Sequence, residues 1–492
     1  MRNIEKTLSI FTYIVYAIIV TILAFFIVFN ANWIIGDQWQ NIRTTGLGQI
    51  MHSTDFCFPN NGRCWPFALL HYNILVLLQC TSPTAHYILN LLLFIIFSVT
   101  IFITINKSIP KRETSSVWNS SIILLASSYL LFREHFVFLD LIYGETILAL
   151  LFAIFMICAI QFYRINNLFC GILALLCAVY ATYCKEPTFA VFITFGATML
   201  IFNFKKLTRN QKIISFLLIA NAIVFLIVYL VLYKRDSGYC PSQYGTTLFS
   251  ILFTYMMQKK ILLIAIPLTL WRLFKIIIYP EREHIFYDAL LFGGMAYILV
   301  ICILRLLSAY YILPALVLIT PAIIYFIYLY FKEKISVLFW LAFACFYGMK
   351  AHKRICVVQD DFQNDHCVVE ILKEYRDNGY QVVYYQADST NYNWYHTLIQ
   401  YRYSGYSGLM AYYENDPQYQ IPIVTRMPKE NAICLYPTEN DFNYPGPHFR
   451  YQPEYKTNIN TRDSLICNYQ LEKVFSRKGV DAYLYQSPIN RN

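Results

Sequence analysis

Three short stretches place charged side chains at the ends of long apolar runs. Asp37 closely follows the first run, Lys185 and Glu186 lie between two later runs, and Arg305 precedes another. A carboxylate can take a proton from an acceptor hydroxyl or amine. Lysine and arginine can hold a phosphate and stabilise its charge as it leaves. These residue types predict transfer of a group from a phosphate to an acceptor, with Asp37 as the base and Lys185 and Arg305 as phosphate ligands.

Further residues near the same ends are candidates for this site. Ionisable residues at membrane depth are costly, so they mark functional sites more often than in soluble proteins. The structural alternative is snorkelling, or an ion pair that only stabilises the fold. We expect Asp55 to be a second catalytic acid and Arg63 and Arg133 to be further phosphate ligands. The residues expected to bind substrate are Trp39, Glu145, Glu186, Tyr310 and Tyr311.

A phosphate held at the depth of the membrane interface is expected to belong to a lipid. Transfer of a sugar from a polyprenyl phosphate needs a base and phosphate-binding cations, but no activated water and no nucleotide cradle. In agreement with this, the sequence contains no Gly-rich P-loop and no dinucleotide-binding fingerprint. We therefore expect a membrane enzyme that takes a sugar from a polyprenyl-phosphate donor.

The composition excludes a soluble enzyme and a disordered chain. Of 492 residues, 58% are hydrophobic and 14% are charged, whereas soluble globular proteins carry about 25% charged residues. The net charge of +10 does not indicate nucleic-acid binding, because residues 1–349 hold 24 basic and 13 acidic residues between apolar runs, and residues 350–492 hold 15 and 16. The chain is predicted to be a polytopic α-helical membrane protein with a soluble C-terminal domain.

Eleven apolar runs alternate with basic loops and are interpreted as membrane spans of a transmembrane catalytic domain, residues 1–349. Arg2 and Lys6 precede the first run, which predicts a cytoplasmic N-terminus. The run at 67–80 is short, so we expect a helix on the outer membrane surface within a first outer loop, 31–83. The predicted spans are 8–29, 84–105, 118–132, 141–163, 168–183, 188–204, 213–233, one that ends near Trp271, 285–304, 314–331 and 335–349.

Residues 350–492 form the second predicted domain, which the alternation of spans places outside the cytoplasm. Strand-like runs occur at 355–359, 381–386, 432–436 and 481–486, with a helical run at 367–378. This pattern predicts a small α/β or α+β fold. The Tyr-rich stretch 392–419 can stack on the sugar rings of an acceptor or lie at a membrane interface, because the same amphipathic ring suits both.

The order and sidedness of these motifs resemble the GT-C class of integral-membrane glycosyltransferases over residues 1–349. In that class an acidic residue just after the first span, at the position of Asp37 here, is the catalytic base. The stretches 61–66 and 143–146 look like segments that precede the second span and begin the fourth. Stretches 183–187 and 305–314 are similar to the lysine turn and the Arg-Tyr-Pro entry to a late span in the lipid A aminoarabinose transferase and protein O-mannosyltransferase relatives.

Two features of this sequence differ from the pattern of the class and indicate which of its branches the chain resembles. Many relatives carry a second acid beside the first-loop base, where this sequence has Gln38, and the His-Pro-Pro motif of the O-mannosyltransferases is absent. The first-loop spacing is closer to that of bacterial enzymes that decorate O-antigen or other envelope glycans. The class implies an inverting transferase in a bacterial inner membrane, with residues 350–492 periplasmic or extracellular.

The resemblance also implies the partners of the chain. These are the lipid bilayer, a polyprenyl-phosphate sugar donor, and a glycan, lipid or protein acceptor; nucleic acid is not expected. No cofactor is assigned. Some relatives bind a divalent cation near the first-loop acid, so a metal stays open here, although Asp37, His52, Asp55 and His71 lack tight ligand spacing.

Two other function classes stay open from the sequence. A transporter or flippase for lipid-linked glycans is expected to have inverted repeats and broken helices near the membrane centre. The charge and Pro/Gly pattern shows no internal repeat, and the candidate charges gather at one face. A non-catalytic scaffold for envelope assembly would act through residues 350–492, so that removal of this domain would abolish its whole function.

Overall fold

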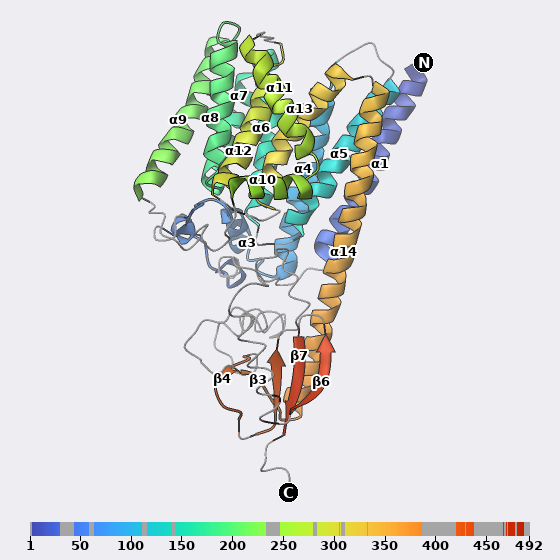
Figure 1. Ribbon diagram of the computed structural model, residues 1–492, viewed down its shortest axis with the longest axis vertical. Helices are drawn as coiled ribbons and strands as arrows, with labels where there is room; N and C mark the ends of the chain where they lie inside the picture. Colours follow the sequence, from blue (N-terminus) through green and yellow to red (C-terminus); the bar gives the residue numbers. More distant parts are fainter. Residues whose placement is uncertain are drawn as a thin grey trace. The chain divides into compact units, whose positions relative to one another are not determined.

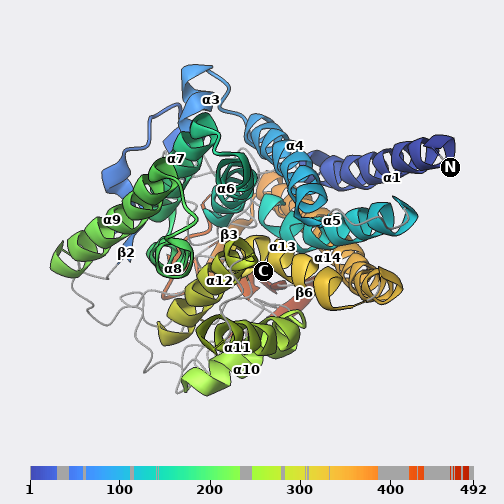
Figure 2. The same cartoon turned by 90° about the horizontal axis from the view of Figure 1, so that it is seen from above.

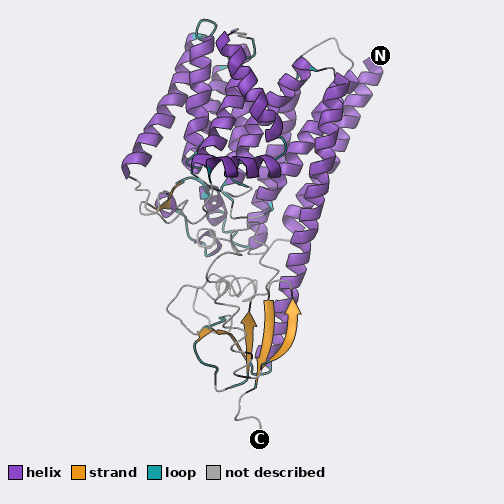
Figure 3. Cartoon of the chain, viewed as in Figure 1, coloured by secondary structure: helices purple, strands orange, loops and turns teal. Residues whose placement is uncertain are grey.

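The chain divides into two compact units. The computed structural model describes residues 2–29, 44–58, 63–110, 116–139, 141, 143–232, 247–278, 283–304, 306, 310–331, 333–385, 420–428, 430–436, 466, 469, 471–477 and 480–486. One unit contains the first helix and the residues from Gly48 to Lys353, and the other consists mainly of residues from Arg354 onward. The first unit is helical, and the second carries the strands of the main sheet (Figures 1 and 3).

Eight helices among the described residues are long and apolar enough to cross a membrane. They are α1 (Arg2–Phe29), α4 (Pro83–Ser108), α5 (Ser116–Phe138), α6 (Glu145–Ile165), α9 (Arg209–Leu232), α12 (Ile285–Ile303), α13 (Leu313–Tyr330) and α14 (Glu333–Asp377). The apolar helices α7 (Leu168–Cys184) and α8 (Thr188–Asn203) are shorter, with 17 and 16 residues. The chain is therefore a polytopic helical membrane protein, as its composition predicts.

The stretch between α9 and α12 forms two helices joined by a sharp bend. α10 (Leu248–Gln258) and α11 (Leu262–Ile278) meet at 118°, at the point where Lys259 interrupts the apolar sequence. α10 buries Tyr255 and exposes Phe249, and in Figure 1 it lies across the ends of neighbouring helices. A helix with one exposed apolar face suits a position along a membrane surface. The span predicted to end near Trp271 therefore corresponds to a bent pair of helices instead of one straight helix.

Helices α6, α12 and α13 lie deepest in the first unit. The most apolar window is 72% buried in α6 and α12 and 83% buried in α13, but only 28% buried in α1 and α9. α6 packs against α4, α7 and α13, whereas α1 and α9 lie at opposite ends of the bundle in Figure 2. Because a helix that is apolar on all sides needs either protein or lipid around it, α1 and α9 present their apolar side chains to the bilayer.

A tight turn makes α6 and α7 antiparallel neighbours. Asn166 ends α6 in the left-handed conformation, with φ of 55°, which asparagine tolerates better than most residues. Asn167 caps α7, because its side chain accepts a hydrogen bond from the Cys170 backbone N–H. The first residue of α6 and the last residue of α7 therefore lie at the same end of the bundle.

The segment before α4 contains several short elements instead of the single surface helix predicted at 67–80. Its described elements are the 3₁₀ helices Ser53–Phe56 and Leu70–Tyr72, the paired strands β1 (Cys57–Phe58) and β2 (Arg63–Cys64), and α3 (Asn73–Leu77). α3 has five residues, and Gln79 follows it with a positive φ of 56°. A positive φ is incompatible with continuing a right-handed helix, so the helical run ends there.

The second unit is a mixed sheet packed on the last turns of α14. The strand order is β4-β3-β5-β7-β6, with β3 parallel to β4 and β5 and the other pairs antiparallel. The strands are β3 (Gln381–Tyr385), β4 (Ile423–Val424), β5 (Ala432–Tyr436), β6 (Glu472–Arg477) and β7 (Val480–Tyr485). Val368 and Leu372 of α14 pack with Ile433 and Leu435 of β5 in one core cluster. The strand predicted at 355–359 is wrong, because these residues belong to α14.

A glycine cap turns the chain from α14 into β3. Gly379 has a φ of 81°, and its backbone N–H donates to the Arg376 carbonyl oxygen. The N–H of Tyr380 donates to the Tyr375 carbonyl oxygen, and the two tyrosine rings pack with centroids 5.4 Å apart. The crossed hydrogen bonds and the apolar contact form a Schellman motif, in which the left-handed position favours glycine.

Candidate functional site

A buried ion pair joins the neighbouring ends of α6 and α7. Lys185 Nζ lies 2.8 Å from Glu145 Oε1. Glu145 is 1% exposed and Lys185 is 5% exposed. Glu145 is the first residue of α6 and Lys185 directly follows α7, so each charge lies at the helix end that its sign favours. Removal of either partner would leave the other as an uncompensated buried charge.

Aromatic residues at the start of α13 cover the lysine. The Tyr311 ring centroid lies 4.7 Å from Lys185 Nζ, within the range of a cation–π contact. The Tyr310 ring packs 4.5 Å from Tyr311 and 4.8 Å from Tyr143. Burial raises the pKa of Tyr310, and Tyr311 and Glu145 raise it further. The Tyr310 hydroxyl therefore stays protonated and able to donate a hydrogen bond.

Glu186 links the segment before α4 to this cluster. Its Oε1 accepts a hydrogen bond of 2.9 Å from the Cys64 backbone N–H, and the Glu186 side chain is buried. Nearby, the Phe67 N–H donates to the Tyr183 carbonyl oxygen, at 3.1 Å. The Tyr180 hydroxyl donates to the Phe67 carbonyl oxygen, at 3.2 Å. This segment thus packs over the turn that carries Lys185 and Glu186.

The structure brings together five of the residues expected at the site, namely Glu145, Lys185, Glu186, Tyr310 and Tyr311. We call them, together with Tyr143, the lysine cluster. Sequence reasoning missed Tyr297 of α12, whose buried hydroxyl interacts electrostatically with Glu145 and Glu186. That hydroxyl has no hydrogen-bond partner within the described part of the chain. Its position inside an apolar run gave no signal, because a buried tyrosine is common in packed helices.

The remaining expected residues fall elsewhere. Asp37, Trp39 and Arg305 lie outside the residues that the structure describes, as does the side chain of Arg63, whose backbone forms part of β2. Asp55 is exposed in the first 3₁₀ helix, where its Oδ2 accepts a hydrogen bond of 2.8 Å from the His52 backbone N–H. This contact is typical of a local turn and does not involve the lysine cluster.

Arg133 belongs to a second group of buried charges, on α5 and at the α10–α11 bend. The Arg133 guanidinium lies 4.6 Å from the Tyr347 ring centroid. Glu134 interacts electrostatically with Arg133 and Lys259, and all three side chains are at least nine-tenths buried. We call Arg133, Glu134 and Lys259 the arginine cluster. Glu134 and Lys259 were not expected at the site, although a charge inside an apolar stretch was a signal that could have identified them.

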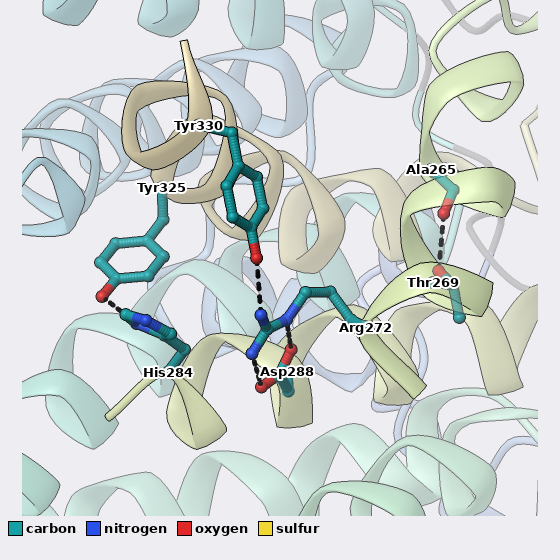
Figure 4. A network of polar contacts seen from close by, with 7 residues as sticks. All are labelled: Ala265, Thr269, Arg272, His284, Asp288, Tyr325 and Tyr330. Carbon is teal, nitrogen blue, oxygen red and sulfur yellow. Dashed lines mark hydrogen bonds and ion pairs between the residues drawn. The ribbon is translucent and has the colours of Figure 1, made fainter. Parts of the chain in front are cut away.

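A third buried network lies where α12 begins and α13 ends (Figure 4). Arg272 of α11 donates from Nε to Asp288 Oδ1 at 2.7 Å and from Nη2 to Oδ2 at 2.9 Å. Its Nη1 donates to the Tyr330 hydroxyl at 2.6 Å. Both charged side chains are fully buried, so this bidentate pair fastens α11 to α12 and α13.

Of the residues considered as metal ligands, the structure describes His52, Asp55 and His71 but not Asp37. Among the described residues, no group of three or more His, Cys, Asp and Glu side chains is placed to hold a metal ion. His52 and Asp55 are close neighbours in the first 3₁₀ turn, but two ligands alone do not define a site. Asp37, the acid beside which a divalent cation stayed open, is outside the described part.

Comparison of the chain with protein-family models, with curated proteins and with solved structures gives no match.

Proposed function

We propose that this protein is a membrane glycosyltransferase that moves a sugar from a polyprenyl-phosphate donor to an envelope glycan, lipid or protein. The lysine cluster is the observation that carries the proposal. It is buried, it combines carboxylates with a cation, and the first outer loop closes over it. Because buried ionisable groups in membrane proteins are costly, such a cluster favours a functional role over an incidental one.

Each side chain can be given a role in the transfer. The acceptor oxygen attacks the anomeric carbon, the bond from that carbon to the phosphate oxygen breaks, and polyprenyl phosphate leaves with the electron pair. Asp37 takes the acceptor proton, with Asp55 as the second candidate acid. Lys185 stabilises the leaving phosphate, since an ammonium group has three donors and can serve a carboxylate and a phosphate together. Displacement in one step inverts the anomeric configuration.

The aromatic residues suit a sugar. Tyr310 and Tyr311 form a tilted pair beside Lys185, and tyrosine presents an apolar face together with a hydroxyl donor. A sugar ring packed on these faces would have its anomeric phosphate next to the ammonium group. Glu145 holds the ammonium in place through the ion pair, and Glu186 keeps the outer loop closed over the ring through its bond to Cys64.

The proposed orientation follows from the positive charges. If α7, α8 and α11 also cross the bilayer, the chain has eleven spans. Lys107, Lys205 and Arg209 would then lie in cytoplasmic loops, and the lysine cluster would lie at the opposite face. In a bacterial inner membrane this face is periplasmic, which is where we place residues 350–492 and the acceptor.

One observation favours a flippase for lipid-linked glycans as the second candidate. Transporters contain broken helices that line their substrate path, and α10 and α11 are joined by a bend of 118°. A flippase moves the donor across the bilayer without breaking the bond between sugar and phosphate. The appearance of a glycosylated product therefore separates the two functions.

The proposal can be tested in cells. A deletion strain should lack one sugar from an envelope glycan, lipid or protein, as measured by mass spectrometry of these fractions. The wild-type gene should restore that sugar, and so should Lys206→Met, which changes an exposed lysine. Lys185→Met should not restore it at equal protein level. Unchanged glycans in the deletion strain, or full restoration by Lys185→Met, would refute the proposal.

A further inference from the structure

One edge of the Arg133 guanidinium is buried and has no partner. The atoms Nε and Nη2 are inaccessible to solvent and meet no hydrogen-bond acceptor in good geometry within the described part of the chain, although the nearby Tyr129 side chain interacts with the guanidinium. The side chain is 8% exposed. These two N–H groups point in parallel and form the fork that binds two oxygens of a carboxylate or phosphate. Buried donors that stay unsatisfied are costly, so their presence indicates a ligand.

Arg272 provides a comparison within the same chain. Both guanidinium groups lie 4.6 Å from an aromatic ring centroid, that of Tyr347 for Arg133 and that of Phe326 for Arg272. In Arg272 the same edge, Nε and Nη2, is filled by the two oxygens of Asp288 (Figure 4). Arg133 has equivalent aromatic support but no carboxylate on its fork.

The neighbouring residue Glu134 has charged neighbours but no hydrogen-bond partner in the part of the chain that the structure describes. It is fully buried, and neither of its carboxylate oxygens makes a hydrogen bond among the described residues. It interacts electrostatically with Arg133 and with Lys259 at the α10–α11 bend. Two cations beside one acidic group give the cluster a positive charge, which suits an anionic ligand. The Glu134 oxygens can accept a hydrogen bond from a hydroxyl on that ligand.

The depth of the cluster indicates the kind of anion. Arg133 lies five residues before the end of α5, or about 7 Å along the axis at roughly 1.5 Å per residue. α10 exposes apolar side chains next to the bend that carries Lys259, as does a helix lying at the interface. If α5 crosses the bilayer and α10 lies along its surface, the site is close to the level where phosphate groups of membrane lipids occur.

We infer that Arg133, Glu134 and Lys259 form a binding site for a phosphate ester that carries a hydroxyl nearby. This site is separate from the lysine cluster, but α10 connects the two. Tyr255 interacts electrostatically with Tyr297 beside the lysine cluster, and Lys259 follows Tyr255 by one helical turn. The inference does not depend on glycosyl transfer, because it rests on the Nε and Nη2 atoms of Arg133 and not on the reaction that the protein performs.

The test is a binding measurement with the full chain in nanodiscs. The probes are a short-chain phosphatidylglycerol, which is a phosphate diester with nearby hydroxyls but no donor for the proposed reaction, the matching diacylglycerol as the neutral control, and inorganic phosphate. Titration calorimetry should show binding of the diester and none of the diacylglycerol. Replacement of the bidentate fork by a point charge in Arg133→Lys should weaken binding about tenfold. Loss of the charge in Arg133→Gln should weaken it about 100-fold.

Two further variants make the result specific. Arg209→Gln changes an exposed arginine and should leave the dissociation constant unchanged. Glu134→Gln removes the acidic group beside the two cations, so binding of inorganic phosphate should be unchanged or up to about tenfold stronger. Unfolding midpoints of all variants, measured without ligand, show whether each one is folded. If Arg133→Gln does not fold, the Arg133→Lys and Glu134→Gln results decide the question.

The outcomes are distinct. Binding of the diester with the stated dependence on Arg133 supports a lipid phosphate. Binding of inorganic phosphate alone, with the same dependence, supports the phosphate site but with a free anion as its ligand. Equal binding of the diester by the wild type and by Arg133→Gln, or no binding of either phosphate, would overturn the inference. Failure of the sugar-transfer assay would not affect it.

Discussion

Lys185 Nζ and Glu145 Oε1 lie 2.8 Å apart in the interior of the helical unit, although 40 positions of sequence separate the two residues. The pair connects the start of α6 to the end of α7, and Tyr311 packs on its cationic side. Because both charges are buried, each depends on the other, and the pair can be probed by removing one partner or both.

The first prediction concerns stability. Lys185→Met and Glu145→Gln should each lower the free energy of unfolding by about 3–5 kcal/mol, because each leaves one buried charge uncompensated. The double variant should lose less than the sum of the two single losses. Unfolding of the purified protein in one detergent checks this. Additive losses in the double variant would show that the two side chains do not interact.

The second prediction compares how replacement of Arg272 and of Arg133 changes the free energy of unfolding. Arg272→Gln should lower the free energy of unfolding by about 3–5 kcal/mol, because it leaves the buried Asp288 carboxylate without its cation. Without ligand, Arg133→Gln should lower this free energy by clearly less than Arg272→Gln does, because Arg133 holds no carboxylate on its fork and Glu134 keeps Lys259 as a second cation. A loss in Arg133→Gln as large as that in Arg272→Gln would mean that the fork is already satisfied within the protein.

Much of the helical architecture can be predicted from the sequence. The long apolar runs correspond to helices such as α4, α6 and α13, because only a helix satisfies its own backbone within a bilayer. The stretch around Lys259, where charge interrupts the apolar run, is where the helix breaks. The run at 355–359 was misread, since its β-branched residues favour a strand locally. Continuation of α14 overrides that preference, as tertiary context often does for β propensity.

The candidate site could be predicted only as a set of residue types. The charges of Glu145, Lys185 and Glu186 stand out in an apolar sequence, but their pairing depends on how α6 packs against α7. The sequence also cannot show that Arg133 and Arg272 differ, because the difference is whether a carboxylate from another helix reaches the fork. The charges of Glu134 and Lys259 also stand out in apolar sequence, but only the structure shows that they are buried together with Arg133.

The third prediction concerns pH. Burial, and then the neighbouring His86, lower the pKa of His71 to about 3. The unfolded chain takes up this proton near pH 6.5 and the folded protein only near pH 3, so protonation favours unfolding between these values. Stability from this residue should be complete above pH 6.5 and fall by at most about 1.4 kcal/mol per pH unit below it.

His71→Gln is the control for the pH effect. The unfolding midpoint of the wild type should fall from pH 7 to pH 4 more steeply than that of the variant, which lacks the titrating group in both states. The two neutral histidine nitrogens are buried without a partner among the described residues, in keeping with a ring that stays uncharged. Parallel pH profiles for the two proteins would contradict this account of His71.

The fourth prediction concerns the cap of α14. Gly379→Ala should destabilise the second unit by about 1 kcal/mol, because alanine is strained at a φ of 81°. Gly379→Asn should cost less, since asparagine tolerates this conformation. Hydrogen exchange at the amides of β3 and of the last turns of α14 reports the local loss. Nothing lies within 4 Å of an added Cβ atom, so equal exchange in wild type and Gly379→Ala would refute the conformational explanation.

The most direct test of the proposed function is a balance of products in nanodiscs. The purified chain is incubated with a panel of polyprenyl-phosphate sugars and with envelope glycans, lipids and proteins as acceptors. The account predicts that one donor yields polyprenyl phosphate and glycosylated product in equal amounts, and that Lys185→Met lowers both by about 100-fold. Consumption of no donor, or equal product from the wild type and from folded Lys185→Met, would contradict it.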